Sequence, residues 1–168
     1  LTIEAQERIG ADGTIVKELD EASLRESLAT LSSQNIEALT VCLINSFTNP
    51  VHEEMVREIS NELLPQIPVS LSSDVIPEMQ EYERTVTTVT NSYVRPRVES
   101  YIRNLEEELE SRMEGVTLNI LRSDGGLASA SSAANYPVNL LMSGPAGGVA
   151  GAIWVAGNAG YKNLLTLD

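Results

Sequence analysis

Apolar residues in the first half of the chain follow two patterns. Alternating or continuous apolar residues predict strands, and apolar residues three or four positions apart predict helices. Partial alternation on both sides of the sequence GADG predicts a hairpin over residues 1–19. The continuous apolar run at 38–47 predicts a strand covered on both faces, and a short strand is predicted over 68–75. Between the hairpin and the first of these strands, Asp20 is expected to cap a helix whose apolar face consists of Leu24, Leu28 and Leu31.

The clearest helical pattern occupies residues 48–68. Asn49 is expected to cap this helix, because Pro50 suits the first helical position. His52 then falls in the first turn of a surface helix, which argues against a Ser-His-Asp triad. The order of elements so far predicts an α/β arrangement with a partly parallel sheet. The apolar stripe of the helix is expected to consist of Val51, Met55, Ile59 and Leu63.

The second half of the chain begins with a long amphipathic pattern over residues 78–114, in which Pro96 should kink or split the helix. A strand over 116–126 that ends in a glycine turn is expected next, and a short helix over 127–137 follows it. The chain then ends with a glycine-rich helix and a buried strand over 162–168.

The sequence SGPAGGVAGA, residues 143–152, predicts a helix with very little side-chain bulk. Each glycine inside a helix costs about 1 kcal/mol relative to alanine, so such a helix needs a reason. Close packing against another backbone is one reason. Free N–H groups at the helix start, at Ser143 and Gly144, could instead hold an anion. The spacing does not match a known phosphate-binding loop, which favours close packing.

Composition and charge exclude several classes of function. A chain of 168 residues is about one domain, and its net charge of −13 disfavours binding to nucleic acid or to an anionic membrane. One cysteine and one histidine exclude an internal disulfide and a zinc site made of His and Cys ligands. No stretch of 18 apolar residues and no signal peptide is present in the sequence, so a cytoplasmic protein is expected.

Polar residues that follow predicted strands are the candidates for chemistry. Asp168 would lie at the carboxyl end of a strand, where α/β folds bind ligands, or would simply begin a turn. The RSDGG sequence would form a loop carrying Ser123, Asp124 and Gly125, which serves either as a ligand loop or as an ordinary connection. Arg84 shares a helix face with Glu81, where the simpler interpretation is one weak ion pair.

Five stretches, in this order, resemble the hydantoinase A/5-oxoprolinase family. They are VCLINSFTNPVHE, SLSSDVIPEMQEYERTVTTVTNSYVRP, RSDGGLAS, YPVNLLMSGPAGGVAGA and NLLTLD, and they span most of the chain from Glu37 onward. The opening hairpin and its helix fit the resemblance as well. The family usually has Asn in place of Asp124 and often Gln in place of Arg122, so the RSDGG loop carries an additional negative charge.

The resemblance implies an α/β fold of the ribonuclease H-like, actin-like ATPase type. In that fold a mixed sheet has helices on both faces, and here a long amphipathic helix is added. Residues 1–76 would be the end of the N-terminal hydantoinase/oxoprolinase region, and residues 77–168 the start of the hydantoinase A domain. The bare helix would pack at the hinge between two lobes, immediately before a strand that ends at Asp168.

The resemblance also implies that the longer parent protein uses ATP and Mg²⁺. Asp168, Ser143 and Gly144 would bind the nucleotide, with Asp168 also near the metal, whereas Ser123, Asp124, Gly125 and Arg84 would lie near the substrate. Both glycine-rich hairpins that hold ATP phosphates in such folds are missing from the sequence. Residues 1–168 alone are therefore expected to bind no cofactor and to be inactive.

The activity implied for the parent is ATP-dependent opening of a hydantoin- or 5-oxoproline-like ring, and its catalytic residues stay unassigned. Partners would be the cyclic amide, a second hydantoinase B-type subunit and, as a homo-oligomer, further copies of the chain. Two alternatives stay open: an ATP-dependent ketone carboxylase subunit, and a non-catalytic α/β interaction module whose glycine helix docks a partner.

Overall fold

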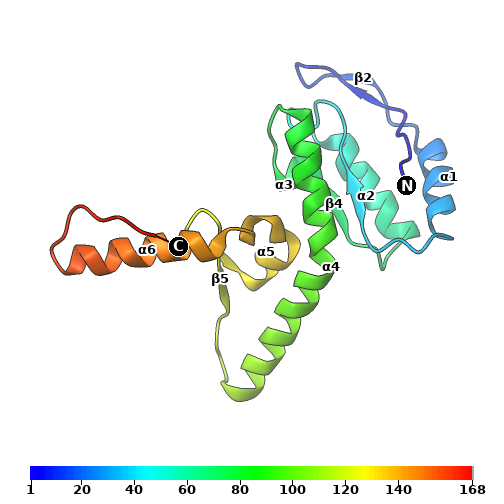
Figure 1. Ribbon diagram of the computed structural model, residues 1–168. Coiled ribbons are helices and arrows are strands. Elements are labelled where there is room, and N and C mark those ends of the chain that lie inside the picture. Colours follow the sequence, from blue (N-terminus) through cyan, green and yellow to red (C-terminus); the bar gives the residue numbers. More distant parts are fainter. Residues whose placement is uncertain (168) are drawn as a thin grey trace. The chain divides into compact units, whose positions relative to one another are not determined.

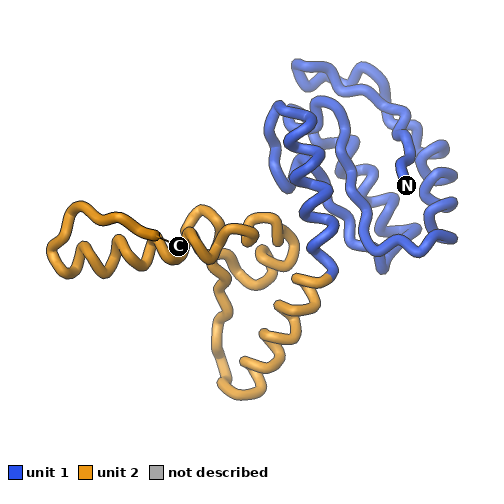
Figure 2. Tube along the Cα trace, in the orientation of Figure 1, with its two compact units in different colours: residues 1–96 blue, residues 97–168 orange. Residues whose placement is uncertain are grey.

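The computed structural model describes residues 1–167 and divides into two compact units, of which the first is Leu1–Pro96 and the second begins at Arg97 (Figure 2). One helix, α4 (Glu81–Arg112), belongs partly to each unit and runs through Pro96 as a continuous helix. The expectation of a long helix in this region is confirmed.

Unit 1 contains a hairpin, a parallel pair of strands, three helices and the first part of a fourth, and their labels follow Figure 1. The expected hairpin and the helix capped by Asp20 are present. The described residues do not form the expected single, partly parallel sheet, because the parallel pair β3–β4 is not hydrogen-bonded to the antiparallel hairpin β1–β2. The elements are β1 (Arg8–Ile9), β2 (Ile15–Lys17), α1 (Glu21–Leu31), β3 (Leu39–Val41), α2 (Val51–Leu63), β4 (Val69–Leu71), the short α3 (Ser72–Val75) and the first part of α4.

Helices cover both faces of the β3–β4 pair (Figure 1). On the α1 and α2 side the strands contribute to an aliphatic core, in which Leu28 is completely buried. The α4 side is polar, because Ser92 accepts a hydrogen bond from Thr40 at 2.7 Å, and the hydroxyl of Thr85 lies 2.9 Å from the thiol of Cys42. The main core consists of Leu19, Leu24, Leu28, Leu31, Val41, Val56, Ile59, Leu64 and Leu71.

The predicted apolar stripe of α2 is confirmed only in part. Ile59 is buried and Met55 packs half-buried against the core, but Leu63 is 38% exposed. The helix instead turns its polar residues His52 and Glu53 inward, with exposures of 1% and 0%. Burying polar groups is unfavourable unless they find hydrogen-bond partners, and these partners come from distant parts of the chain that periodicity does not reveal.

Unit 2 begins with the second part of α4 and adds a second antiparallel pair of strands. The strand β6 was not expected, because its three residues were assigned to the following helix. The expected strand over 162–168 is also wrong, since Tyr161–Leu167 have no regular structure and are exposed. The elements are β5 (Asn119–Leu121), β6 (Leu127–Ser129), α5 (Ala130–Asn135), the 3₁₀ helix η1 (Pro137–Leu140) and α6 (Ser143–Asn158).

The glycine-rich sequence forms the helix α6, as predicted, but close packing occurs at only one of its inner glycines. A Cβ atom on Gly147 would overlap the side chain of Leu121 in β5, whereas one on Gly144, Gly148 or Gly151 would meet open space. None of the residues of α6 is buried in the described chain. The absence of a side chain at Gly147 therefore lets α6 lie close to Leu121 of β5.

We predict that Gly148→Ala stabilises α6 by about 0.5–1 kcal/mol, because alanine restricts the unfolded chain and meets no neighbouring atom. Gly147→Ala is the matched variant, and its gain should be smaller because Leu121 must move. Amide hydrogen exchange within α6 measures both effects. Equal gains for the two variants would contradict the packing described here.

Candidate functional site

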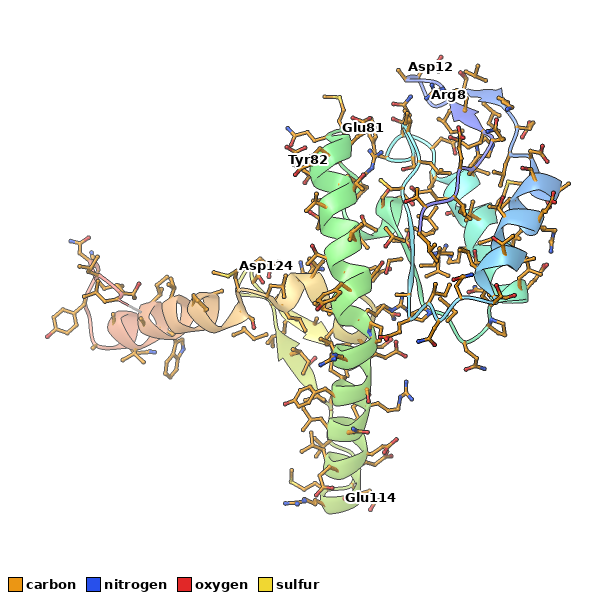
Figure 3. The ribbon with its side chains drawn as sticks, turned by 45° about the vertical axis from the view of Figure 1, so that its right-hand side comes forward. Arg8, Asp12, Glu81, Tyr82, Glu114 and Asp124 are labelled. Carbon is orange, nitrogen blue, oxygen red and sulfur yellow. The ribbon has the colours of Figure 1, made fainter. Side chains whose placement is uncertain are left out.

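The predicted ligand loop lies between β5 and β6 and is closed by its own aspartate. The two carboxylate oxygens of Asp124 accept hydrogen bonds from the Gly126 N–H, at 2.9 Å, and from the Arg122 guanidinium, at 2.7 Å. Gly125 has a φ of 82°, a left-handed conformation that glycine adopts without steric cost. Figure 3 marks Asp124 in this loop, near the start of α6.

Hydrogen bonds join this loop to the beginning of α6. The Met142 N–H donates to Ser123 Oγ at 3.0 Å, and the Ser123 N–H donates to the Asn139 carbonyl at 2.7 Å. The loop residues predicted to lie near substrate and the helix residues predicted to bind nucleotide are thus brought to one junction. We call this the loop–helix junction, and it consists of Arg122–Gly126 and Met142–Gly144.

The loop–helix junction offers donors suited to an anion. The first hydrogen bond of α6 runs from the Ala146 N–H to the Met142 carbonyl at 3.3 Å, so the N–H groups of Ser143 and Gly144 precede the helical ladder. The positive end of the helix dipole lies at the same place. The carboxylate of Asp124 is the opposing feature, because it repels an anion and engages the Arg122 guanidinium.

The environment of Asp124 favours its ionised form. The N–H of Gly126 and, more weakly, the charge of Arg122 lower the pKa of this carboxyl below its ordinary value of 3.8. The side chain therefore carries its negative charge throughout the neutral pH range. Its hydrogen bonds hold the loop in one shape as long as it stays ionised.

Arg84, a predicted substrate residue, lies deep inside unit 1. Its side chain is 1% exposed, and its guanidinium donates to the carbonyls of Glu78, at 2.9 Å, and Leu43, at 2.8 Å. The guanidinium carbon also lies 5.4 Å from the centre of the Phe47 ring. Arg84 therefore ties the start of α4 to the segment that follows β3.

Glu53, in the first turn of α2, is an acidic residue with 0% exposure. Its carboxylate accepts hydrogen bonds from the Leu43 N–H at 2.8 Å, the Ser72 hydroxyl at 2.6 Å and the Ser73 N–H at 2.8 Å. Leu43 follows β3, and Ser72 follows β4. The carboxyl ends of both parallel strands are therefore fastened to the first turn of α2.

Leu43 connects the two buried charges. Its N–H donates to Glu53 and its carbonyl accepts from Arg84, so one residue of the main chain lies between a carboxylate and a guanidinium. A buried hydrogen bond also joins α2 to the segment before β1, where His52 Nδ1 lies 2.7 Å from Glu7 Oε2. The expected surface position of His52 is wrong. No sequence signal distinguished Glu53 or His52 from the exposed acids and bases around them.

The structure describes neither a metal site nor a membrane span. Within residues 1–167 no group of three His, Cys, Asp or Glu side chains is arranged to hold a metal ion. None of the helices in this described range is long and apolar enough to cross a bilayer. Asp168, the predicted Mg²⁺ and nucleotide residue, lies outside the described residues.

Models of known protein families match both parts of the chain. The hydantoinase/oxoprolinase model matches residues 84–168, and the model of the hydantoinase/oxoprolinase N-terminal region matches residues 1–64. The chain belongs to the hydantoinase/oxoprolinase family. The resemblance drawn from the five sequence stretches is confirmed.

Relatives in this family are considerably longer than the chain. The acetophenone carboxylase gamma subunit of Aromatoleum aromaticum is 33% identical, covering 100% of this chain and 23% of the relative. The 5-oxoprolinase of Saccharomyces cerevisiae is 32% identical, covering 82% of this chain and 10% of the relative. The crystal structure of the ATP-dependent caprolactamase from Pseudomonas jessenii matches with a TM-score of 0.84 and 30% identity, covering 93% of this chain and 23% of that one. The chain thus spans less than a quarter of the length of these hydantoinase/oxoprolinase relatives.

We predict that Glu53→Gln lowers the free energy of unfolding of unit 1 by about 2–3 kcal/mol, because an amide cannot accept all three hydrogen bonds of the carboxylate. Glu54→Gln is the matched control, since Glu54 is the exposed next residue of the same turn. Its effect should stay within about 0.5 kcal/mol. Urea denaturation measures both, and similar losses for the two variants would contradict the role of Glu53.

We predict that the pKa of the Asp124 carboxyl lies below 3.8. In the Arg122→Gln variant this pKa should rise toward 3.8 without reaching it, because the hydrogen bond from the Gly126 N–H remains. The stabilisation that this depressed pKa gives the loop is complete above the ordinary value and is lost as the pH falls through the folded value. An NMR pH titration of the Asp124 carboxyl follows both quantities. An unchanged midpoint in the Arg122 variant would show that its charge contributes nothing.

Proposed function

We propose that residues 1–168 are the central part of a longer ATP-dependent enzyme that opens a hydantoin- or 5-oxoproline-like cyclic amide. Relatives named 5-oxoprolinase and ATP-dependent caprolactamase support this substrate class, since oxoproline and caprolactam are both cyclic amides. The structural observation that carries the proposal is the loop–helix junction, where the hydrogen bond from Met142 to Ser123 joins a polar loop to a helix start.

The donors of the loop–helix junction suit the phosphate oxygens of ATP. The N–H groups of Ser143 and Gly144 and the guanidinium of Arg122 would hold them, and Asp124 would keep Arg122 in place. Bound ATP would supply the phosphoryl group that makes an amide oxygen a better leaving group. The contribution of this chain is positioning, because Ser123 fixes the direction of the helix start. Asp168 would lie near the Mg²⁺ of the bound ATP and act on it indirectly.

The parent protein would have the ribonuclease H-like, actin-like ATPase fold, of which the mixed α/β structure described here is one part. Residues 1–76 would complete its N-terminal region, and residues 77–168 would begin its hydantoinase A domain. Relatives named as alpha and gamma subunits support the need for a second, hydantoinase B-type subunit. We further propose a cytoplasmic location, and that residues 1–168 by themselves do not hydrolyse ATP.

A second candidate is an ATP-dependent ketone carboxylase subunit. The observation in its favour is that the acetophenone carboxylase gamma subunit aligns with the whole of this chain. The same junction would serve both reactions, because each needs a carbonyl oxygen to be activated by phosphate transfer.

We predict that the longer parent protein hydrolyses hydantoin or 5-oxoproline only when ATP is present, and that acetone with bicarbonate is not consumed. Ser123→Ala should lower the ATP-dependent rate by about ten- to a hundredfold, because the helix start loses its positioning contact. Ser131→Ala, at an exposed serine of α5, is the matched control and should leave the rate unchanged.

Three outcomes would contradict the proposal. Consumption of acetone instead of the cyclic amides would select the carboxylase. Equal rates for the two serine variants would remove the loop–helix junction from the site. Micromolar binding of Mg-ATP to residues 1–168 alone, measured by calorimetry, would show that the chain contains a complete nucleotide site.

A further inference from the structure

The first part of α4 turns its polar side toward the strands and its apolar side away from them. Arg84, Thr88 and Asn91 are buried, with exposures of 1%, 0% and 0%. Figure 3 shows Tyr82 near one end of α4, on the side away from the strands. On that side lies a row of four residues of unit 1, which we call the outer stripe. It consists of Tyr82, Val86, Val89 and Tyr93, which are 76%, 47%, 49% and 83% exposed.

The residues of the outer stripe are spaced by four, three and four positions, so they follow one another along one side of the helix. Steps of three and four are also the spacing at which two helices pack side by side in a coiled coil. The order of these steps is the same from either end. An antiparallel second copy therefore places its Tyr93 beside Tyr82 and its Val89 beside Val86. A twofold symmetric contact needs such a self-complementary surface.

The charges near the two ends of the outer stripe favour the antiparallel direction. Glu83 lies at the beginning of the stripe and Arg97 one turn beyond its end, and both are exposed residues of the continuous helix α4. About four helical turns separate them, so they lie on the same flank of the stripe. In an antiparallel pair the Glu83 carboxylate approaches the Arg97 guanidinium of the second copy at both ends. In a parallel pair each group would approach its own like charge.

A second copy fits the outer stripe better than an unrelated partner does. An unrelated helix would require neither the symmetric spacing nor the opposite charges at the two ends, whereas a twofold contact requires both. The net charge of −13 opposes indiscriminate association between copies, so a contact depends on a local match. Four side chains are far fewer than the about 20–30 residues that each partner contributes to a standard interface, so the expected dimer is weak.

We propose that the outer stripe of α4 binds the outer stripe of a second copy of this chain, with the two helices antiparallel about a twofold axis. The tyrosines pair at the ends, the valines meet at the centre, and Glu83 pairs with Arg97 on the flank. The contact uses no residue of the loop–helix junction. The inference is therefore independent of the proposed function.

Sedimentation of residues 1–168 over a range of micromolar concentrations tests the dimer. The wild-type chain should pass from monomer to dimer as its concentration rises. Tyr93→Ala should raise the dissociation constant at least about tenfold, because each dimer loses the aromatic contact twice. Tyr101→Ala is the matched control and should leave the constant unchanged, since Tyr101 is an exposed tyrosine of the same helix outside the outer stripe. A chain that stays monomeric, or equal effects of the two variants, would overturn the proposal.

Charge reversal tests the antiparallel direction. Glu83→Arg and Arg97→Glu should each raise the dissociation constant by about three- to tenfold, because like charges then meet at both ends of the stripe. The variant with both changes should recover the wild-type constant, since each carboxylate again meets a guanidinium. Added salt should reduce the effect of each single change. A double variant as weak as the single variants would contradict the antiparallel pair.

The longer polypeptide decides whether another surface covers the outer stripe. Hydroxyl-radical footprinting reports the exposure of Tyr82 and Tyr93, and sedimentation reports the number of copies. Protected tyrosines in a monomer would assign the stripe to a segment outside residues 1–168, and protection only after a second kind of subunit is added would assign it to that subunit. Either result would overturn the proposal. Protected tyrosines in a dimer that does not open cyclic amides would support it and contradict the proposed function alone.

Discussion

The buried carboxylate of Glu53 is the constraint on which unit 1 depends. A charge removed from water is tolerated only when hydrogen-bond donors replace the water, and here two main-chain N–H groups and one hydroxyl do so. These donors belong to the segments that follow β3 and β4. The carboxylate therefore holds the carboxyl ends of both parallel strands at the first turn of α2, and the core of leucines beneath them packs around this fixed point.

Arg84 extends the same arrangement to α4. Its guanidinium binds the carbonyl of Leu43, whose N–H already donates to Glu53, so the buried positive and negative charges are joined through the main chain. Farther along α4, Asn91 donates to Ser70 of β4 at 3.1 Å. This contact adds to those of Ser92 with β3 and of Thr85 with Cys42, the residue that follows β3. Such polar contacts are directional, and they fix the register of the helix on the strands more closely than apolar contacts do.

In unit 2, too, directional hydrogen bonds fix the position of a segment, here the loop between β5 and β6. Its core consists mainly of small residues around Ile102, and the shape of its loop comes from hydrogen bonds to Asp124 and Ser123 rather than from side-chain bulk. The result is a polar loop held next to a helix start, on a helix that offers little side chain of its own. A site for a large charged ligand needs this combination, because the main chain must come close to the ligand and must be held rigidly.

The sequence by itself determined the local elements and the family. Leucine spacing with the Asp20 cap located α1, the glycine pattern located α6, and five ordered stretches indicated the family correctly. The tertiary structure alone decided which residues are buried. His52 and Glu53 turn inward because Glu7, Leu43 and Ser72 approach from distant positions, and the strand predicted after α6 does not form within the described residues because a strand needs a neighbour to pair with. Periodicity records the preference of each side chain for water, but it carries no information about partners that only folding brings together.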